Sequence, residues 1–449
     1  MKSFFTLFAF LMMQVASNAQ CWKAISCGEQ HCVGLKTDGT LYGWGGNTVG
    51  EFGYGSVANI DAPVQIGIDN NWDTIAAGSY HALALKNDGT LWVSGYNSYG
   101  QLGLGHTVNA DGFVQVGSAT DWSFISVGDY HSFAIKTDGS LWASGSNTNF
   151  ELGIGNNIDQ NSFIRVGLDN DWAYVCGGNT HSLGVKTNGT LWSWGSNAWG
   201  ENGIPSSSGS SQPVQVNGDV DWKMVQAGTY FSLALKTDGR LYGWGYNQDG
   251  YAGLGAATSE DQPTQIGSSN AWVSVIGGYS HSLALRNDGT LWGWGANSYS
   301  RVTGDNTFNN QTTPIQIGTA TDWDLYAIGI YHSMGTRSNG DVWAWGGESR
   351  GQLANATAGN MATMGVVQTC ATVGVEEENQ LVWKVFPNPA TDRIAFEGLA
   401  NETINVFTID GKLVLSLIIN GNETIDISGL EKGMYLIQSS KSTIRLVKH

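Results

Sequence analysis

Short runs of alternating hydrophobic and polar residues recur along most of the chain. In one unit, residues 72–78 predict a short strand and residues 81–86 alternate as a second. The Asn-Asp-Gly-Thr segment at 87–90 predicts a two-residue hairpin, because Asp and Gly tolerate the positive φ of a type I′ turn. A third strand is predicted at residues 91–95 and, after a long Gly-rich loop, a fourth at 113–116. The unit is therefore four short antiparallel strands.

This unit recurs seven times with a period of 50 residues and one additional residue before the last copy. Three series mark equivalent positions: Trp22, Trp72, Trp122, Trp172, Trp222, Trp272 and Trp323; His31, His81, His131, His181, Phe231, His281 and His332; and Asp-Gly or Asn-Gly pairs beginning at Asp38, Asp88, Asp138, Asn188, Asp238, Asp288 and Asn339. Four strands in each of seven units predict an all-β fold, with a seven-bladed β-propeller at residues 20–370. The repeated Trp side chains are expected to form the core between blades.

The repeat resembles a known family. Residues 278–295 follow the pattern Gly-x-x-His-Ser-Leu-Ala-Leu-Arg-x-Asp-Gly-x-Leu-Trp-x-Trp-Gly, and residues 100–105 read Gly-Gln-Leu-Gly-Leu-Gly. These motifs resemble the regulator of chromosome condensation repeat, from Trp22 to about Thr369. The resemblance implies a seven-bladed propeller, but little about activity, because one scaffold hosts many functions. The nucleotide exchange activity of the founding member uses a wedge inserted into one blade, and these units leave no room for one.

The period ends at Cys370. A linker at residues 371–383 precedes a segment, residues 384–449, whose alternating strands and Gly turns predict a small β-sandwich. This segment closely resembles the type A C-terminal sorting domain of the type IX secretion system. The resemblance is carried by Pro387, Asn388, Pro389, Asp410, Gly411, Lys412, Gly433 and Tyr435. It implies export across an outer membrane by the type IX machinery, followed by removal of the domain and release or surface anchoring of the rest.

The N-terminus and the charge agree with export. Residues 1–19 are predicted to be a signal peptide, with Lys2, an apolar run and small residues before the expected cleavage site. A lipid anchor at Cys21 is disfavoured, because Gln20 stands where a small residue is required. The formal charge of -17 repels phosphates, which argues against nucleic-acid binding. No later run is long enough to be a transmembrane segment. The expected location is secreted or on the outer cell surface, reached through the periplasm.

The five cysteines predict disulfides in an oxidising compartment. The position seven repeats before Cys370 lies two residues from Cys21. Because seven repeats complete the ring, the two cysteines are expected to lie close together and to form a disulfide that closes it. Cys27 and Cys32 flank one hairpin turn and are a second candidate pair. Cys176 is then left as a free thiol.

The sequence contains no evident catalytic set. The His series could hold a metal, but a sevenfold ring spreads the ligands too far apart, and His followed by Ser favours hydrogen bonds between strands. Aspartates flank the Trp positions, for example Asp69, Asp121 and Asp219. They could bind calcium, but no segment has the spacing of a calcium-binding loop, so a solvated acidic rim is the favoured interpretation. No Ser/His/Asp or Cys/His set stands out. We therefore expect no cofactor, no bound metal and no enzymatic activity.

The long loops and the turns before each His share one face of the propeller, because the strands alternate in direction. Ligand contact is expected on this face, because loops vary and the strands position them. Flat side chains there could stack on sugars or anchor a protein: Tyr99, Trp199, Tyr246, Tyr251 and Tyr299. The favoured function is a non-catalytic binding or adhesion module for an extracellular protein or glycan. The alternative is a secreted hydrolase or lyase that works in the central funnel.

Overall fold

The computed structural model describes residues 22–55, 58–205, 208–356, 359–369, 384–386, 390–397, 401–408, 412–420, 423–439 and 443–448. The chain divides into two compact units, Met1–Cys370 and Ala371–His449. Within the described residues, no helix has the length and apolar character that crossing a membrane requires. Both units are built from β-strands, as the repeat predicts.

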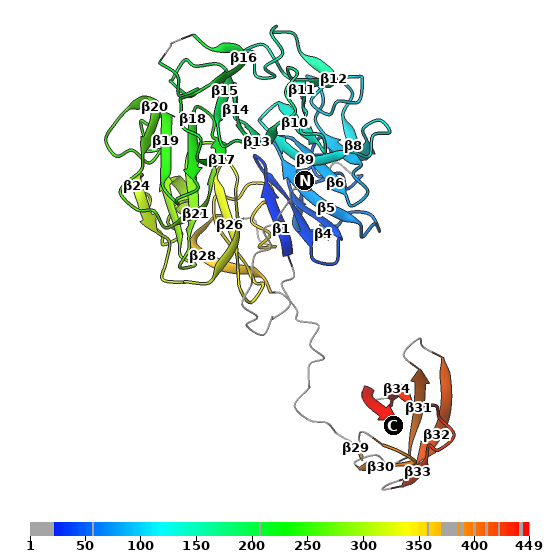
Figure 1. The fold of residues 1–449 in the computed structure, drawn as a ribbon. Coiled ribbons are helices and arrows are strands. Elements are labelled where there is room, and N and C mark those ends of the chain that lie inside the picture. The colour runs from blue at the N-terminus through cyan, green and yellow to red at the C-terminus, as the bar shows by residue number, and fades with distance from the viewer. Residues whose placement is uncertain are drawn as a thin grey trace, which may run out of the picture. The chain divides into compact units, whose positions relative to one another are not determined.

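The first unit is a propeller of seven four-stranded antiparallel sheets (Figure 1). Blades 1 to 4 are β1 (Trp22–Cys27), β2 (His31–Lys36), β3 (Leu41–Gly45) and β4 (Ile60–Gln65); β5 (Trp72–Ala77), β6 (His81–Lys86), β7 (Leu91–Gly95) and β8 (Ala110–Gln115); β9 (Trp122–Val127), β10 (His131–Lys136), β11 (Leu141–Gly145) and β12 (Gln160–Arg165); and β13 (Trp172–Gly177), β14 (His181–Lys186), β15 (Leu191–Gly195) and β16 (Ser210–Gln215).

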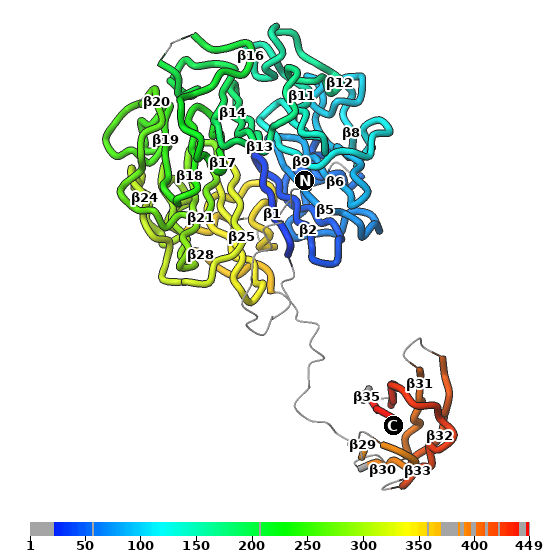
Figure 2. The backbone as a smooth tube through the Cα atoms, viewed as in Figure 1, coloured from blue at the N-terminus to red at the C-terminus, as the bar shows by residue number. Residues whose placement is uncertain are grey.

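The remaining three blades continue the same order. They are β17 (Trp222–Ala227), β18 (Phe231–Lys236), β19 (Leu241–Tyr246) and β20 (Ser259–Gln265); β21 (Trp272–Gly277), β22 (His281–Arg286), β23 (Leu291–Gly295), the 3-10 turn η1 (Ser298–Ser300) and β24 (Gln311–Gln316); and β25 (Trp323–Ile328), β26 (His332–Arg337), β27 (Val342–Gly346) and β28 (Met361–Gln368). Each sheet consists of four consecutive strands, and β1 lies beside β25 (Figure 2). The ring therefore closes without exchanging a strand between the first and last blades.

The hairpin between the second and third strands differs from the predicted type I′ turn. In blade 2, Gly89 has a φ of 77°, but Asp88 does not adopt a positive φ. The Asp88 carboxylate instead accepts hydrogen bonds from the backbone N–H of Thr90 at 3.0 Å and from its hydroxyl at 2.7 Å. This cap keeps Asp88 in an ordinary conformation, so only the glycine needs the left-handed region.

The fourth strand of blade 2 also begins three residues before its predicted start, at Ala110. Its register with β7 shifts between Val93 and Gly95, and Ala110 pairs with Gly95 beyond that shift. The irregularity hides the first half of the strand from a search for strict alternation.

The propeller core lies between the blades, as the Trp series predicts. Trp72 is 4% exposed and packs with Val33 and Leu35 of the preceding blade. Its ring also meets Trp92 edge to face at a centroid distance of 5.8 Å. The Lys86 ammonium lies 4.7 Å from the Trp72 ring centroid and 4.1 Å from that of Trp92, and covers the end of this core.

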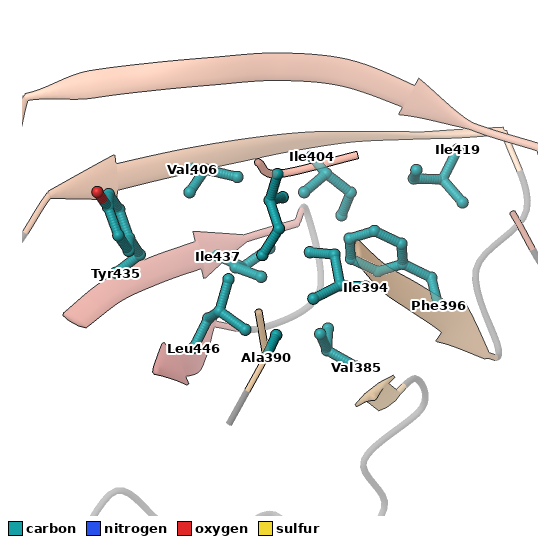
Figure 3. Close-up of a cluster of buried hydrophobic side chains, with 11 residues drawn as sticks. Val385, Ala390, Ile394, Phe396, Ile404, Val406, Ile419, Tyr435, Ile437 and Leu446 are labelled. Carbon is teal, nitrogen blue, oxygen red and sulfur yellow. The ribbon is translucent and has the colours of Figure 1, made fainter. Parts of the chain in front are cut away.

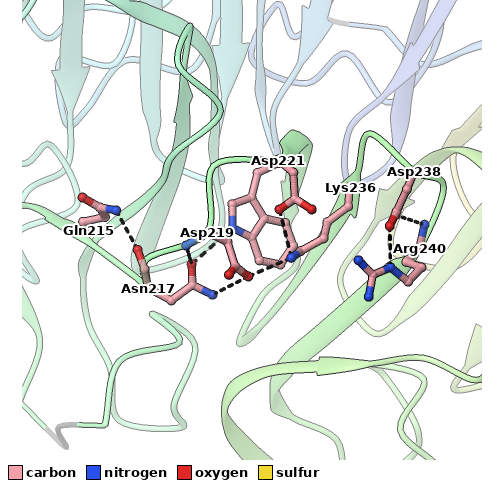
Figure 4. A network of polar contacts seen from close by, with 8 residues as sticks. Gln215, Asn217, Asp219, Asp221, Lys236, Asp238 and Arg240 are labelled. Carbon is pink, nitrogen blue, oxygen red and sulfur yellow. Dashed lines mark hydrogen bonds and ion pairs between the residues drawn. The ribbon is translucent and has the colours of Figure 1, made fainter.

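The acidic residues beside the Trp positions are paired rather than simply solvated. The Lys236 ammonium, which covers the Trp222 ring, lies 2.8 Å from an Asp219 oxygen and 2.9 Å from an Asp221 oxygen (Figure 4). Lys86, Lys136 and Lys186 make equivalent ion pairs in blades 2, 3 and 4. In these four blades the acidic rim holds the lysine that covers the Trp ring, and its aspartate side chains remain exposed, as expected of a solvated rim.

Buried polar contacts join successive blades. His131 Nε2 lies 3.2 Å from Ser182 Oγ in the next blade, and that hydroxyl donates to the Glu151 carbonyl at 2.8 Å. Because the serine has one hydrogen, His131 is the donor in the first contact. Equivalent pairs are His81 with Ser132, His181 with Ser232 and His281 with Ser333. The predicted histidine hydrogen bonds are confirmed, and they connect blades rather than strands of one blade.

Backbone contacts from the long loops reinforce these seams. The Gly105 N–H donates to the Asn161 carbonyl of the next blade at 2.7 Å, and Ala356 closes the ring by donating to Asp61 at 3.2 Å. Blade 4 carries Pro205 at this position, and proline has no N–H to donate. The contact between blades 4 and 5 must therefore rely more on side chains.

The cysteine predictions have mixed outcomes. Cys27 and Cys32 form a disulfide between paired positions of β1 and β2, and Cys176 is a buried free thiol. Both predictions are confirmed. Cys21 and Cys370 lie outside the described residues, so their disulfide stays a prediction.

The second unit is a small sandwich of two sheets. One contains β29 (Lys384–Phe386), β30 (Arg393–Glu397) and β33 (Thr424–Asp426), and the other contains β32 (Leu413–Ile419), β31 (Glu402–Thr408), β34 (Gly433–Gln438) and β35 (Thr443–Lys448). Ile394 and Phe396 of the first sheet pack against Ile404 and Ile437 of the second (Figure 3). Of the motif residues, Tyr435 is buried and its hydroxyl donates to the Glu431 carbonyl at 2.8 Å, while Lys412 is exposed. Pro387, Asn388, Pro389, Asp410 and Gly411 lie outside the described residues.

The seam between blades 1 and 2 lacks the serine and provides a two-way test. Ala82 occupies the serine position between blades 1 and 2, and His31 Nε2 has no hydrogen-bond partner. We expect Ser182→Ala to lower the free energy of unfolding by about 1–3 kcal/mol, because it leaves the buried His131 Nε2 unpaired and removes one of the two hydrogen bonds to the Glu151 carbonyl, which still accepts from Trp194. Ala82→Ser should raise it by about 1 kcal/mol by supplying a partner for His31. Denaturant unfolding of both variants measures the two changes in unfolding free energy. Changes of the same sign would contradict a stabilising His–Ser contact between blades.

Candidate ligand-binding face

A central channel passes between the first strands of the blades and contains a cavity of about 370 Å³. Phe124 and Tyr174 line it toward the hairpin side, with ring centroids 5.0 Å apart. A glycine at the loop end of each first strand lets the blades approach closely. At Gly28, an added Cβ would lie 2.0 Å from the Gly78 carbonyl oxygen and 2.5 Å from the His31 ring. This crowding explains the Gly-x-x-His spacing of the repeat.

The residue after each of these glycines breaks the sevenfold symmetry. The series is Glu29, Ser79, Asp129, Asn179, Thr229, Tyr279 and Ile330, which we call the mouth ring. All except Asn179 line the channel cavity. Polar and acidic residues gather in blades 1 to 4, whereas blades 6 and 7 contribute Tyr and Ile. The mouth ring thus has a distinct polar sector, which the sequence analysis missed.

The two carboxylates of the mouth ring are perturbed by burial. Desolvation raises the pKa of Asp129, although the Asn179 amide donates to it at 2.6 Å and Ser79 also hydrogen-bonds to it. Desolvation likewise raises the pKa of Glu29, against the hydrogen bond from Tyr80, and the Asp129 charge adds to the rise. The polar sector therefore presents two carboxyl groups to the channel, and such groups suit a ligand that brings hydrogen-bond donors or positive charge.

The five predicted aromatic residues fall into three clusters on the loop face. Tyr99 contacts Tyr130 at 5.4 Å, and Tyr130 is stacked on Tyr80 at 6.3 Å. The second cluster joins Trp199 to Tyr246 at 4.9 Å and Tyr246 to Tyr251 at 5.5 Å, and the third joins Tyr299 to Tyr331 at 5.8 Å.

These aromatic residues are not equally accessible. Trp199 is 48% exposed, Tyr299 44% and Tyr99 39%. Tyr251 is partly buried, and its backbone carbonyl accepts from Trp294 and Ser282 of the next blade. Tyr246 is also partly buried. Three of the five are therefore available to a ligand, whereas Tyr251 serves the seam.

The histidine series is buried and neutral. His81, His131 and His181 are fully buried, and desolvation lowers the pKa of each to about 3. Each uses Nε2 to contact a serine of the next blade. The rings are thereby committed to separate seams rather than directed at a common point.

Comparison with known proteins agrees with this architecture. Residues 11–274 match the family model of the RCC1-like domain, and residues 272–301 and 327–352 match the regulator of chromosome condensation (RCC1) repeat. The chain belongs to the RCC1-like domain family. Residues 384–449 match the secretion system C-terminal sorting domain. The recognition of both families from sequence motifs is confirmed.

Solved structures share the propeller fold of this RCC1-like chain. Human WBSCR16 is 21% identical with a TM-score of 0.66, and the match covers 74% of this chain and 94% of that one. Prp20p from Saccharomyces cerevisiae is 21% identical with a TM-score of 0.61, covering 68% and 80% respectively. At this level of identity the likeness establishes the fold, not the ligand.

The buried histidines make stability depend on pH. Because the folded-state pKa of His181 is about 3 and the unfolded value is about 6.5, its contribution is complete above pH 6.5 and is lost as the pH falls toward 3. We expect His181→Phe, which copies Phe231 of blade 5, to reduce the loss of unfolding free energy between pH 7 and pH 5 by about 2 kcal/mol. Phe231→His should increase that loss. Urea unfolding at the two pH values provides the measurement, and unchanged pH dependence in both variants would exclude the mechanism.

Proposed function

We propose that this RCC1-like propeller is a non-catalytic binding or adhesion module that acts outside the cell. The sorting domain implies export to the cell surface or secretion, and the propeller is of a type suited to binding. The full proposed route begins with the signal peptide at residues 1–19 and passes through the periplasm. Engagement of the type IX secretion machinery by residues 384–449 completes it.

The observation that carries this proposal is the contrast between regular seams and an irregular loop face. Four of the seams repeat the same contact between a histidine and a serine of the next blade. The mouth ring and the exposed Tyr99, Trp199 and Tyr299 differ from blade to blade. Such a rigid frame with a variable face supports recognition of an extracellular protein or glycan, with aromatic rings as stacking surfaces and the polar sector as the specificity element.

Glu29 and Asp129 also favour a second candidate, a hydrolase or lyase working in the funnel. Two carboxylates with raised pKa values in a cavity resemble the arrangement that acid–base catalysis needs. The hydrogen bonds from Asn179, Ser79 and Tyr80 already engage both groups, which supports the binding function over the catalytic one.

Ligand binding is tested with the exported protein on arrays of immobilised glycans and cell-surface proteins. For a probe that the wild type retains, we expect Trp199→Ala to weaken binding by about 10- to 100-fold, because it removes an exposed aromatic contact. Leu168→Ala is the matched control, because Leu168 is 85% exposed and follows β12 on the hairpin face. Equal effects of the two substitutions would contradict the assignment to the loop face.

The mouth ring distinguishes binding from catalysis. Asp129→Asn should weaken retention of the same probe about 10-fold or more, while incubation with the wild type leaves the probe chemically unchanged, as judged by mass spectrometry. Turnover of the probe by the wild type that is lost in Asp129→Asn with binding retained would instead establish the enzyme.

Export provides an independent prediction. We expect deletion of residues 385–449 to trap a folded propeller in the periplasm, because the propeller is a separate compact unit and the deletion removes the sorting domain. Immunoblots of periplasmic and external fractions measure the distribution, with Trp199→Ala as the control that should be exported normally. Normal yield of the truncated chain outside the cell would refute the sorting role.

A further inference from the structure

The seam that closes the ring, between blades 7 and 1, is built from different atoms than the other seams. His332 Nε2 lies 3.3 Å from Cys32 Sγ, where four other seams place a serine hydroxyl against the histidine. Met334 Sδ lies 3.7 Å from Cys32 Sγ and 3.8 Å from Cys27 Sγ. Three sulfur atoms and one imidazole nitrogen therefore gather at a single point.

These sulfur atoms are departures from the repeat. The position of Cys32 is Ala or Ser in the other blades, and that of Met334 is Val, Leu or Phe. The position of Cys27 holds Ala, Val, Gly or Ile elsewhere. A disulfide between β1 and β2 requires only the two cysteines, so it explains neither the methionine nor its placement against both sulfurs.

The cluster has the composition of a metal site. In the part of the chain that the structure describes, one group of His, Cys or acidic residues is close enough together to hold a metal ion. It consists of Cys27, Cys32 and His332, whose ligand atoms all lie within 4.8 Å of one another. Thiolate and thioether sulfur together with imidazole suit a soft cation, and Met is a ligand typical of copper rather than of zinc or calcium.

Three of the distances between these ligand atoms are also close to the edges of tetrahedral coordination. With metal–sulfur bonds of about 2.3 Å and metal–nitrogen bonds of about 2.0–2.1 Å, sulfur–sulfur edges are about 3.8 Å and sulfur–nitrogen edges about 3.6 Å. The two contacts of Met334 Sδ, at 3.7 and 3.8 Å, already have the length of such edges, and the His332 contact at 3.3 Å is close to it. The two cysteine sulfurs, which are bonded to each other, must separate to reach such an edge.

We propose that Cys27, Cys32, His332 and Met334 form a redox-controlled Cu(I) site at the ring-closing seam. The disulfide state holds no metal. An external dithiol converts it by exchange: the dithiol becomes a disulfide as the Cys27–Cys32 bond breaks and takes up two electrons and two protons. Cu(I) then binds as the cysteines lose protons to become thiolates. Cys27 lines the central channel, which provides the route for the dithiol and the ion.

The test uses the full-length protein under anaerobic conditions, with Cys21→Ser and Cys370→Ser in every sample so that these two thiols do not contribute. The protein is treated with dithiothreitol, desalted and titrated with Cu(I) in the presence of bathocuproine disulfonate. We expect the reduced protein to withhold one equivalent of Cu(I) from the chelator and the oxidised protein to withhold none. X-ray absorption at the copper edge should show sulfur ligands together with one nitrogen ligand.

Two further variants distinguish a Cu(I) site from a disulfide that only links β1 to β2. Met334→Leu keeps the disulfide and the apolar contact, and we expect it to weaken Cu(I) binding by about 10- to 100-fold. Cys176→Ser is the matched control and should bind like the parent, because that thiol lies in blade 4. Equal Cu(I) retention by reduced and oxidised protein, unchanged affinity in Met334→Leu, or loss of binding in Cys176→Ser would each overturn the proposal. Circular dichroism confirms that each variant is folded.

Discussion

The seam between neighbouring blades is the contact on which the structure depends. A single four-stranded blade cannot bury both of its faces, so each Trp and aliphatic side chain must pack against the next blade, as Trp72 packs on Val33. The buried His–Ser contact adds a directional element, because an unpaired imidazole in this core is costly. Closing the ring therefore requires a seventh seam of equal quality, and the sulfur-rich contact of blades 7 and 1 supplies it.

The same arrangement separates stability from recognition. The packed seams fix the first strands, and these strands place Glu29, Asp129 and Tyr279 at one end of the channel. Because Gly28 and Gly128 lie against a carbonyl of the next blade and Gly278 lies against the Ile328 side chain, the backbone of the mouth ring has little freedom. The side chains that follow can vary without disturbing the frame. In physical terms the loop face is where sequence change is tolerated and where binding can be selected.

The sequence predicted the elements that repeat and missed those that depend on three-dimensional position. Spacing alone identified the Trp72 and His81 series, the hairpins and the Cys27–Cys32 pair, because each is local or periodic. The mouth ring was missed because residues 29, 79 and 129 are 50 residues apart, and periodicity does not reveal that their strands line the channel. The signal was present in the unmatched residue after each glycine. The turn type failed because the Asp88 cap competes with the conformation expected from the Asp-Gly pair.

The central claim is that the loop face, and not the hairpin face, meets the ligand. Hydroxyl-radical footprinting of the exported protein, with and without a probe identified on the arrays, tests it most directly. The account predicts lower oxidation of Tyr99, Trp199 and Tyr279 in the complex and unchanged oxidation of Ile68 and Leu168, which are 93% and 85% exposed on the opposite face. Protection of Ile68 and Leu168 without protection of the three aromatic residues would contradict it.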